Sequence, residues 1–401
     1  MSLTENRNEL SPEWGIDHFD PWDRRIAYSN IWEIYRNMRE TAPVVHSDAL
    51  GGFWCVTRYE EVRTAARDPQ TFSSNYALAI GKQNWPKEKK TSRLIETDPP
   101  QHTRKRKAMQ APLLLKKMDG FADGIREGVR HLLDRIAKMG EFDIVADLAE
   151  PIPQEALADI LGFDEDTRKK NRELVLDFVH SDLARSKETQ ENFMVFLEET
   201  IQDKINNPGN DFLSELCHME IDGERFSEQE LVGMLHGFAL AGHHTSIDGI
   251  SSMLRRVSDE KIKQLYLNDP TIAPQIVEES LRADPPIHLE GRSTTIKTVL
   301  GGIEIPEGES VALLYASANH DDRQFENPEI FDPLRPSNQH LAFGHGIHMC
   351  IGMHLARLEM RTVLEEVMKR FPNYKLIGDP VDSGMTFGHH MGWDEMRASI
   401  E

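Results

Sequence analysis

Apolar residues recur along most of this chain at helical spacing, and short β-rich runs are confined to a few segments. Long stretches have apolar residues three and four positions apart, which predicts amphipathic helices that each bury one face. Helices are predicted at residues 31–40, 59–68, 118–138, 153–162, 166–183, 188–206, 269–282 and 353–371. Residues 112–220 are predicted to be helical throughout. The pattern therefore indicates a mainly α-helical fold with a small β-rich region.

The β-rich runs predict two hairpins. The first joins residues 43–45 to residues 53–57 across Gly51-Gly52. The second joins residues 299–305 to residues 311–314 across a Pro-Glu-Gly-Glu turn. Both consist of β-branched and aromatic residues bounded by glycine or proline, which is the usual signal for a hairpin.

Two segments lack a clear period. Residues 1–30 are polar with scattered aromatic side chains, which predicts an arm on the surface. Residues 75–90 predict a long loop, and loops of that length inside a compact fold are usually functional or mobile. No internal repeat, low-complexity tract or linker interrupts the chain. Residues 1–401 are therefore expected to form one domain.

The longest helical pattern runs from Ser227 to Val257. It begins with a capping box, in which Ser227 is followed three residues later by Glu230. A helix of this length spans roughly 45 Å, and each interior glycine costs about 1 kcal/mol relative to alanine. The glycines inside it are Gly233, Gly237, Gly242 and Gly249. They predict a bare backbone surface for a flat partner, with close helix–helix packing as the alternative.

The composition excludes several classes of function. The chain has 67 acidic and 46 basic residues among 401, a net charge of −21, which disfavours nucleic acid and anionic membranes as partners. No apolar run reaches the roughly 18 residues of a membrane span, and the first residues lack the apolar core of a signal peptide. Three widely separated cysteines indicate neither a disulfide framework nor a zinc site. A soluble, cytoplasmic protein is predicted.

One cysteine lies in an unusual context. Cys350 is flanked by glycines and directly precedes the predicted helix 353–371. Backbone N–H groups at a helix N-terminus favour an anion and lower the pKa of a thiol, which supplies a thiolate able to bind a metal. The glycines permit φ > 0 and close approach to the main chain. The alternative is an inert, buried cysteine in a glycine-rich turn.

Residues 343–352 resemble the haem-binding signature of the cytochrome P-450 family, F-x-x-G-x-(H/R)-x-C-x-G. The fixed positions are all filled, by Phe343, Gly346, His348, Cys350 and Gly352. The resemblance implies the α+β, triangular-prism fold of the family, with haem b between the long central helix and the cysteine loop. It also implies that Cys350 ligates the haem iron, where a thiolate donates electron density and favours O–O cleavage.

A second stretch, residues 98–106, resembles the family segment D-P-P-x-H-x-x-x-R. His102 and Arg106 are spaced i, i+4, so a helix would place both on one face. The resemblance implies that they bind a haem propionate through charge-assisted bonds, and it assigns the same role to Arg292 and His348. A solvated basic helix is the alternative for this stretch.

A third stretch resembles the family motif A-G-x-(D/E)-T-(T/S) and begins at Ala241-Gly242 in the middle of the central helix. The resemblance places Ala241 and Gly242 against the haem and implies that the Thr245 hydroxyl bonds to oxygen species. His244 occupies the position of the acid. An imidazole can carry protons near neutrality, so His244 either replaces the carboxylate in the proton relay or turns away and leaves that task to water.

A fourth stretch, Glu279 to Arg282, matches the family motif E-x-x-R. The resemblance implies a buried charge network behind the haem that Arg335 completes and that organises the cysteine loop. On an exposed helix the same i, i+3 pair would contribute at most about 1 kcal/mol.

The resemblance covers most of the chain, with its motifs in the family's order. The tail departs from it, because residues 388–393 lack the usual Leu-Pro pair. Candidate substrate-pocket residues are Leu235, Phe238, Ala241, Ile287, His288 and Leu289.

The predicted activity is monooxygenation, in which one atom of O₂ enters a small organic substrate by hydroxylation or O-demethylation. Because no G-x-G-x-x-G motif is present, electrons are expected from a separate ferredoxin or flavodoxin with its NAD(P)H reductase. Arg104, Lys105 and Lys107 are candidate docking charges, which mainly steer encounter. A peroxide-dependent haem-thiolate peroxygenase and a non-catalytic haem-binding protein are the alternatives.

Overall fold

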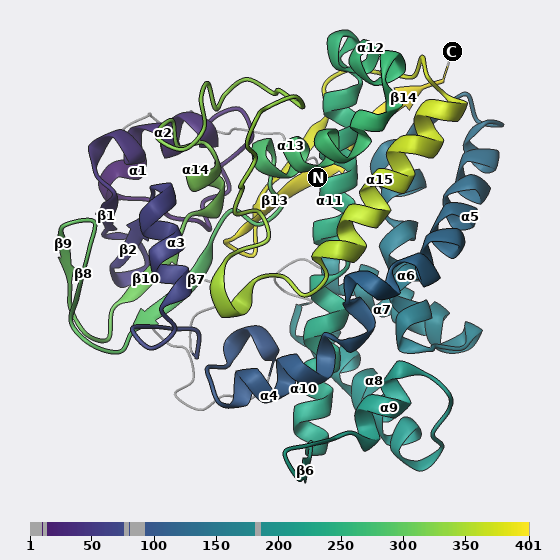
Figure 1. Ribbon diagram of the computed structural model, residues 1–401, viewed down its shortest axis with the longest axis horizontal. Helices are drawn as coiled ribbons and strands as arrows, with labels where there is room; N and C mark the ends of the chain where they lie inside the picture. Colours follow the sequence, from purple (N-terminus) through teal and green to yellow (C-terminus); the bar gives the residue numbers. More distant parts are fainter. Residues whose placement is uncertain (1–9, 11–13, 76–79, 81–92, 181–185, 401) are drawn as a thin grey trace.

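The computed structural model describes residues 10, 14–75, 80, 93–180 and 186–400. Helices gather on one side of the molecule, and the largest sheet lies on the other with the N-terminal helices and α14 (Figure 1). The helices are α1 (Trp14–Asp17), α2 (Ile31–Thr41), α3 (Tyr59–Arg67), α4 (Gln101–Met109), α5 (Asp119–Ile136), α6 (Pro151–Leu161), α7 (Glu165–His180), α8 (Ser186–Asn206), α9 (Phe212–His218), α10 (Glu228–Ala241), α11 (His244–Val257), α12 (Glu260–Asn268), α13 (Ala273–Ala283), α14 (Tyr315–Asn319) and α15 (Met353–Arg370). The mainly helical class predicted from the sequence is confirmed.

The strands are short, as expected for a minor β component. They are β1 (Val44–Ser47), β2 (Phe53–Val56), β3 (Phe72–Ser73), β4 (Glu141–Asp143), β5 (Glu220–Ile221), β6 (Glu224–Arg225), β7 (Glu290–Thr294), β8 (Thr298–Leu300), β9 (Ile303–Ile305), β10 (Ser310–Leu313), β11 (Lys375–Leu376), β12 (Val381–Thr386), β13 (His390–Glu395) and β14 (Arg397–Ser399). The largest sheet has the order β1-β2-β10-β7-β3.

The first predicted hairpin is confirmed, and the second is wrong. Strands β1 and β2 pair antiparallel, with Val45 opposite Cys55. The second hairpin instead turns at Gly301-Gly302, both with positive φ, so that β8 pairs with β9. Strand β10 leaves this hairpin and joins the largest sheet, parallel to β2 and antiparallel to β7. A glycine pair allows a tighter turn than the Pro-Glu-Gly-Glu stretch that the prediction used.

Residues 112–220 are not helical throughout. Strand β4 lies between α5 and α6 and pairs with β14 near the C-terminal end of the chain. The partner is more than 250 residues away in the sequence, so local periodicity gives no sign of it. The four helices predicted within this stretch are present as α5 to α8, and the predicted end of the third extends beyond the described residues.

The prediction of a surface arm is wrong for the described part of residues 1–30. Phe19 and Ile26 are completely buried and pack with Tyr35 of α2 in a small core next to the largest sheet. These apolar side chains are too widely spaced to show a period, although each one is buried in the core and fixes its part of the segment against it. Apart from Asn75 and Ile80, the loop predicted at residues 75–90 lies outside the described residues.

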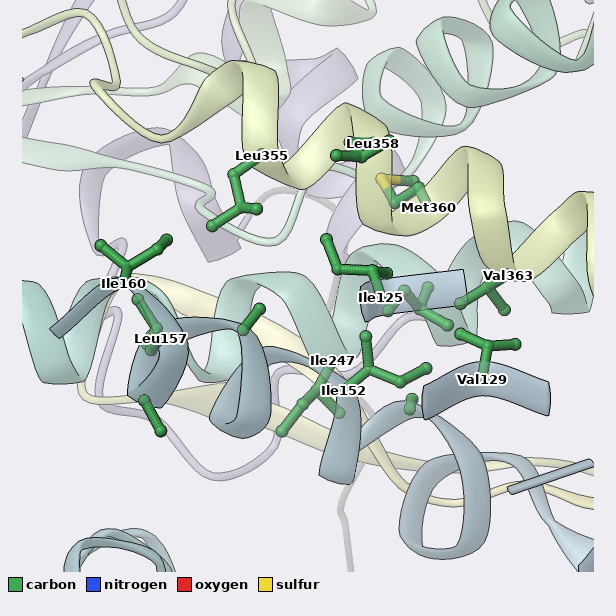
Figure 2. Packing of buried hydrophobic residues seen from close by; sticks show 14 of the residues in the cluster. Ile125, Val129, Ile152, Leu157, Ile160, Ile247, Leu355, Leu358, Met360 and Val363 are labelled. Carbon is green, nitrogen blue, oxygen red and sulfur yellow. The ribbon is translucent and has the colours of Figure 1, made fainter. Parts of the chain in front are cut away.

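The main core lies between helices α5, α6, α11 and α15. Figure 2 shows Leu355, Leu358 and Val363 of α15 above Ile125 and Val129 of α5. Residues of α6 and α11 fill the same cluster from the other side. This packing fixes α15, which follows the cysteine loop directly, against α11. No helix in the described ranges is both long enough and apolar enough to cross a bilayer.

The central helix is interrupted, which corrects the prediction of one continuous helix from Ser227 to Val257. The capping box at Ser227 and Glu230 is present as predicted. Helix α10 then ends at Ala241, and α11 starts at His244 after a residue, His243, with φ −97° and ψ −76°. The interruption falls on the motif predicted to contact the haem and oxygen.

Candidate active site

The cysteine loop enters α15 and is tied to two other segments. The backbone N–H of Cys350 donates to the carbonyl of Phe343 at 2.8 Å, which closes the loop on itself. Arg106 of α4 donates from Nη1 to the carbonyl of Ile347 at 2.8 Å. Cys350 is exposed, whereas Cys55 and Cys217 are buried. The prediction that Cys350 lies immediately before a helix N-terminus is confirmed.

Glycine is required in this loop for a steric reason. Gly346 has φ +72°, and a Cβ atom there would lie 2.2 Å from the carbonyl oxygen of Ala66. The loop therefore lies directly against the end of α3, and any side chain at position 346 would separate the two. Gly344 also has positive φ, but its Cβ position is 3.8 Å from the Tyr315 hydroxyl and would fit.

We expect Gly346→Ala to lower the free energy of unfolding by about 2–4 kcal/mol, because a strained φ and a backbone clash add together. Gly140→Ala is the matched control: φ there is +78° and nothing lies within 4 Å of the Cβ position. The control should cost only about 1–2 kcal/mol for the left-handed conformation. Urea unfolding of both variants measures the difference, and equal losses would show that the contact with Ala66 is unimportant.

The expected direction of the Cys350 pKa shift is wrong in this structure. Although Cys350 keeps exposed surface, the protein atoms packed around it desolvate the thiolate and raise the pKa of the thiol. The backbone N–H groups of Gly352 and Met353 and the charge of Arg106 oppose that effect without overcoming it. The helix N-terminus therefore acts on this sulfur as predicted, but burial outweighs it.

The residues predicted to bind propionates come together beside the loop. His102 of α4 is buried, and its ring centroid lies 4.5 Å from that of His348. Burial and the Arg106 guanidinium lower the pKa of His102 to about 4, so the ring is neutral at pH 7. Nε2 of His102 has no hydrogen-bond partner in the described part of the chain. A buried nitrogen without a partner is costly, so this atom fits a ligand carboxylate.

Arg292 lies on β7, where its Nη1 donates to the carbonyl of Gly291 at 2.6 Å. It is buried, and its charge acts on Tyr315, whose hydroxyl lies 3.8 Å from the Cβ position of Gly344. The sequence interpretation missed Glu290, two residues earlier on the same strand. Burial raises the pKa of Glu290 to about 8, and its Oε2 has no hydrogen-bond partner among the described residues. A protonated carboxyl at this position can donate a hydrogen bond.

The interrupted helix presents an accessible face. Gly237, Ala241 and Thr245 follow at intervals of four residues, and none of them is buried. The Thr245 hydroxyl donates to the Ala241 carbonyl at 2.8 Å, across the break between α10 and α11. At Gly242 a Cβ atom would lie 2.8 Å from a methyl group of Leu157, so this glycine packs closely against α6.

The six predicted pocket residues differ in exposure. Leu235, Phe238, His288 and Leu289 are buried. Only Ala241 and Ile287 of the six are accessible. Helix α10 is apolar on almost every face, so its periodicity could not indicate which residues face the site.

Two of the three candidate docking charges are not free surface cations. Lys105 is buried. Arg104 pairs with Glu230 at 3.2 Å and is largely covered. Lys107 is exposed and lies 3.7 Å from the equally exposed Asp222. A run of basic residues on one helix turn was expected to face solvent, but α4 packs against its neighbours on more than one side.

The predicted charge network is present. Glu279 and Arg282 are completely buried, with Arg282 Nη2 2.8 Å from Glu279 Oε1. Arg335 lies at 3.4 Å from the same carboxylate, and the backbone N–H of Asp332 donates to it at 2.9 Å. The competing interpretation, an exposed surface pair, is excluded by the burial. The partners on Asp332 and Arg335 tie α13 to the segment that leads into the cysteine loop.

A second buried acid was not identified as functional from the sequence. Glu359 of α15 is 1% exposed and accepts a hydrogen bond from Ser246 of α11 at 2.7 Å. Burial raises its pKa to about 7. This bond links the helix that follows Cys350 to the residue next to Thr245. The bond therefore connects the helix on the cysteine side of the site to the helix on the threonine side.

The raised pKa of Glu359 gives a pH-dependent stability. The folded state binds the carboxyl proton of Glu359 more tightly than the unfolded state does, in which the pKa is near 4.5. The stabilisation from this proton is therefore fully present below pH 4.5 and is lost as the pH rises through 7. Glu359→Gln does not titrate. Relative to wild type it should gain up to about 3 kcal/mol between pH 5 and pH 8. Urea unfolding at both pH values tests this, and a constant difference would contradict it. The hydrogen bond from Ser246 lowers the pKa of Glu359. Without it, Ser246→Ala should lose more stability than wild type as the pH rises from 5 to 8.

The donor set fits a cofactor that carries its own ligands. In the described ranges, no group of three or more His, Cys, Asp or Glu side chains is placed to hold a metal ion. With a single exposed thiol as the protein ligand, the other ligands of a bound metal must belong to a cofactor. A porphyrin provides them, because its nitrogens already coordinate the iron. The exposed Cys350 and the available Nε2 of His102 both fit such a group. This arrangement is that of a haem-thiolate protein.

Comparisons with known proteins agree with this class. The family model described as Cytochrome P450 matches residues 255–376. Cytochrome P450 107B1 of Saccharopolyspora erythraea is 32% identical over 87% of this chain and 89% of its own length. Steroid C26-monooxygenase of Mycobacterium tuberculosis is 33% identical over 86% of this chain and 87% of its own length.

Solved structures show the same similarity. Cytochrome P450 CYP268A2 of Mycobacterium marinum, in complex with pseudoionone, superposes with a TM-score of 0.85 at 26% identity, covering 93% of this chain and 95% of that one. P450BioI in complex with a ligated acyl carrier protein gives a TM-score of 0.84 at 26% identity, covering 93% and 98%. The chain belongs to the cytochrome P450 family. It is an oxidoreductase of the monooxygenase type, and its family uses a haem-thiolate cofactor.

Proposed function

We propose that this protein holds haem b through Cys350 and inserts one atom of O₂ into a small organic substrate, by hydroxylation or O-demethylation, while the other atom leaves as water. The hydrogen bond between Ser246 and Glu359 carries this proposal. It links α15, the helix that follows Cys350, to the first turn of α11, next to Thr245, and so connects the element after the candidate iron ligand to the element that carries the candidate oxygen-binding hydroxyl.

When bound, the haem with its thiolate ligand supplies reductive activation of O₂ and cleavage of the O–O bond. The protein supplies position and protons. His102, Arg106, Arg292 and His348 would hold the propionates, and the neutral ring of His102 would donate from Nε2. Phe343, Gly346 and Gly352 would shape the loop around the sulfur.

On the other side of the site, Ala241 is exposed and its small side chain leaves the helix surface low enough for a flat ring to approach, whereas Gly242 lies against Leu157 of α6. Thr245 would exchange its bond to the Ala241 carbonyl for one to oxygen, because a hydroxyl can both donate and accept. Ala241 and Ile287 are the two predicted pocket residues that are accessible to a substrate. His244 would supply protons.

We infer that electrons come from a ferredoxin or flavodoxin with its NAD(P)H reductase, because the sequence has no dinucleotide-binding glycine motif. Lys107 is the candidate docking charge that is still exposed. We further propose that residues 1–401 work as one domain in the cytoplasm.

The test uses holoprotein and a substrate chosen by screening small organic compounds for a shift of the Soret band. The protein is supplied with ¹⁸O₂, NAD(P)H, a reductase and either ferredoxin or flavodoxin, and the product is analysed by mass spectrometry. One ¹⁸O atom in a hydroxylated product supports the proposal, and so does a demethylated product formed together with formaldehyde, because in O-demethylation the inserted oxygen leaves on the methyl carbon. Product formed with hydrogen peroxide but not with the electron-transfer system would indicate a peroxygenase. No product with any reductant, for any compound that shifts the band, would indicate a non-catalytic haem protein.

A further inference from the structure

The two places where this sequence departs from the family pattern lie in contact. His244 stands where the motif has an acid, and His390 belongs to the turn that lacks the Leu-Pro pair. Their ring centroids are 5.6 Å apart, and the ring planes cross at 75°. His244 begins α11 and His390 begins β13, so the contact joins segments almost 150 residues apart in the chain.

A buried carboxylate holds His390 in this position. Oδ2 of Asp248 lies 2.8 Å from Nε2 of His390, and both side chains are 7% exposed. On the other edge of the ring, Nδ1 lies 3.2 Å from the Thr386 hydroxyl. Asp248 is one helical turn after His244, so the two share a face of α11 and His390 contacts both of them.

The strand carrying His390 is shaped to reach Asp248. A Cβ atom at Gly392 would lie 1.8 Å from Oδ1 of Asp248, so only glycine allows β13 to approach α11 this closely. The backbone N–H of Trp393 donates to the same oxygen at 3.3 Å. A buried carboxylate needs such partners for stability alone. Stability alone does not explain why the group beside Asp248 is the imidazole of His390. It also does not explain why that ring contacts His244, which occupies the acid position of the motif.

The geometry limits what His390 can do. Nδ1 of His390 is within hydrogen-bond distance of the Thr386 hydroxyl, Nε2 is near Asp248 by distance without a hydrogen bond to it, and the contact with His244 is edge to face. His390 therefore acts on His244 by packing and by charge. A partner that fixes the orientation of a functional imidazole commonly changes function about 10- to 100-fold when it is removed, as for metal-bound histidines.

Resting on the proposed function, we propose that the Asp248–His390 pair positions His244 as the proton donor beside Thr245, in place of the family's carboxylic acid. In each delivery an N–H bond of His244 breaks, its proton passes to the oxygen site, and solvent water returns one proton to the ring. The histidine ends unchanged and no electrons move through it. Asp248 and His390 are positioning residues in this scheme.

Several polar or titratable side chains surround His390, and their charges would affect the pH dependence of the proposed proton transfer. Asp248 faces it from α11 and Thr386 from β12. His389 precedes it, and His288 lies across the isolated bridge between Ile287 and His390. Burial, and to a smaller extent the charge of His390, lowers the pKa of His288 to about 3 and that of His389 to about 4.

The test combines a double-mutant cycle with spectroscopy on the holoprotein. His244→Gln, His390→Gln, the double variant and the isosteric Asp248→Asn are compared for product formed per reductant consumed and for the pH dependence of that ratio. We expect His390→Gln and Asp248→Asn to lower the ratio about tenfold and to change its pH profile. In the His244→Gln background the His390→Gln change should have no further effect.

A second readout does not depend on turnover. Long-range ¹H–¹⁵N spectra of histidine-labelled holoprotein in its diamagnetic carbon monoxide complex report the tautomer and titration of each ring. We expect Asp248→Asn to alter both for His244. His131→Gln on the exposed surface of α5 is the control and should leave the spectrum of His244 and the product ratio unchanged.

The outcomes separate this proposal from the proposed function. An unchanged tautomer and titration of His244 in Asp248→Asn, or additive effects of the two histidine changes on turnover, would overturn the positioning role. Absence of turnover in the wild type would count against the proposed function, and the spectra would still decide the contact. Thermal unfolding of each variant identifies any loss that comes only from stability.

Discussion

Replacing Glu279 by glutamine is expected to lower the free energy of unfolding by about 3–5 kcal/mol at pH 7, because it leaves a buried guanidinium without its counter-charge. Arg282 is completely buried, and two of its nitrogens bind the Glu279 carboxylate at 2.8 Å. Arg335 and the N–H of Asp332 lose the same partner. The segment that leads into the cysteine loop should therefore loosen, and haem content should fall with stability.

The pH dependence of this loss has a definite sign. Although burial acts to raise it, the pKa of Glu279 is lowered in the folded state by Arg282 and the other partners of the carboxylate. Its contribution is therefore present above the unfolded value of 4.5 and disappears as the pH falls through the folded pKa. The gap between wild type and Glu279→Gln should narrow under acid conditions.

An exposed pair with the same spacing provides a matched control. Glu60 of α3 is 61% exposed and pairs at i, i+3 with Arg63 at 2.8 Å. Glu60→Gln should cost at most about 1 kcal/mol. Urea unfolding followed by circular dichroism, with haem content measured in parallel, compares the two variants. Equal losses would show that the buried pair contributes no more than a surface pair and would remove its proposed structural role.

Cys350→Ser is expected to abolish product formation and the optical signature of thiolate ligation. A serine hydroxyl has nearly the same size but stays protonated near neutral pH and donates far less electron density to iron. The loop is held by the Cys350 N–H to the Phe343 carbonyl and by Arg106 to the Ile347 carbonyl, none of which involves sulfur. The fold should therefore persist while the chemistry is lost.

Cys217→Ser is the control, since Cys217 is buried in α9 and belongs to the main core. It should lose some stability through a buried hydroxyl and keep the spectrum and the activity. Absorption spectra of reduced, carbon monoxide-treated protein and product analysis compare the three proteins. Wild-type levels of product in Cys350→Ser would show that another residue holds the iron.

The sequence predicted those parts of the fold that depend on local patterns. The capping box at Ser227 and Glu230, the hairpin of β1 and β2, and the helix after Cys350 all follow from residues that are close together in the chain. Pairings between distant segments were not predictable, such as β4 with β14 and β10 with β2. No periodicity within a strand specifies a partner hundreds of residues away.

The site divides in the same way. Cys350, His102 and Arg106 could be found because they occupy a spaced motif, and the structure brings their segments together. The raised pKa of Glu359 and the contact between Asp248 and His390 depend on burial and on distant packing. The substrate pocket stays a prediction, because α10 is apolar on nearly every face and its sequence does not show which face is covered.

The central claim is that the sulfur of Cys350 ligates the haem iron, and one spectrum tests it most directly. Purified wild-type protein is reduced under carbon monoxide and its Soret band is recorded while circular dichroism confirms that the protein is folded. We predict the long-wavelength Soret maximum that is characteristic of thiolate ligation, and its absence from Cys350→Ser. A folded wild-type protein that binds no haem, or whose maximum lies where histidine-ligated haem absorbs, would contradict the account.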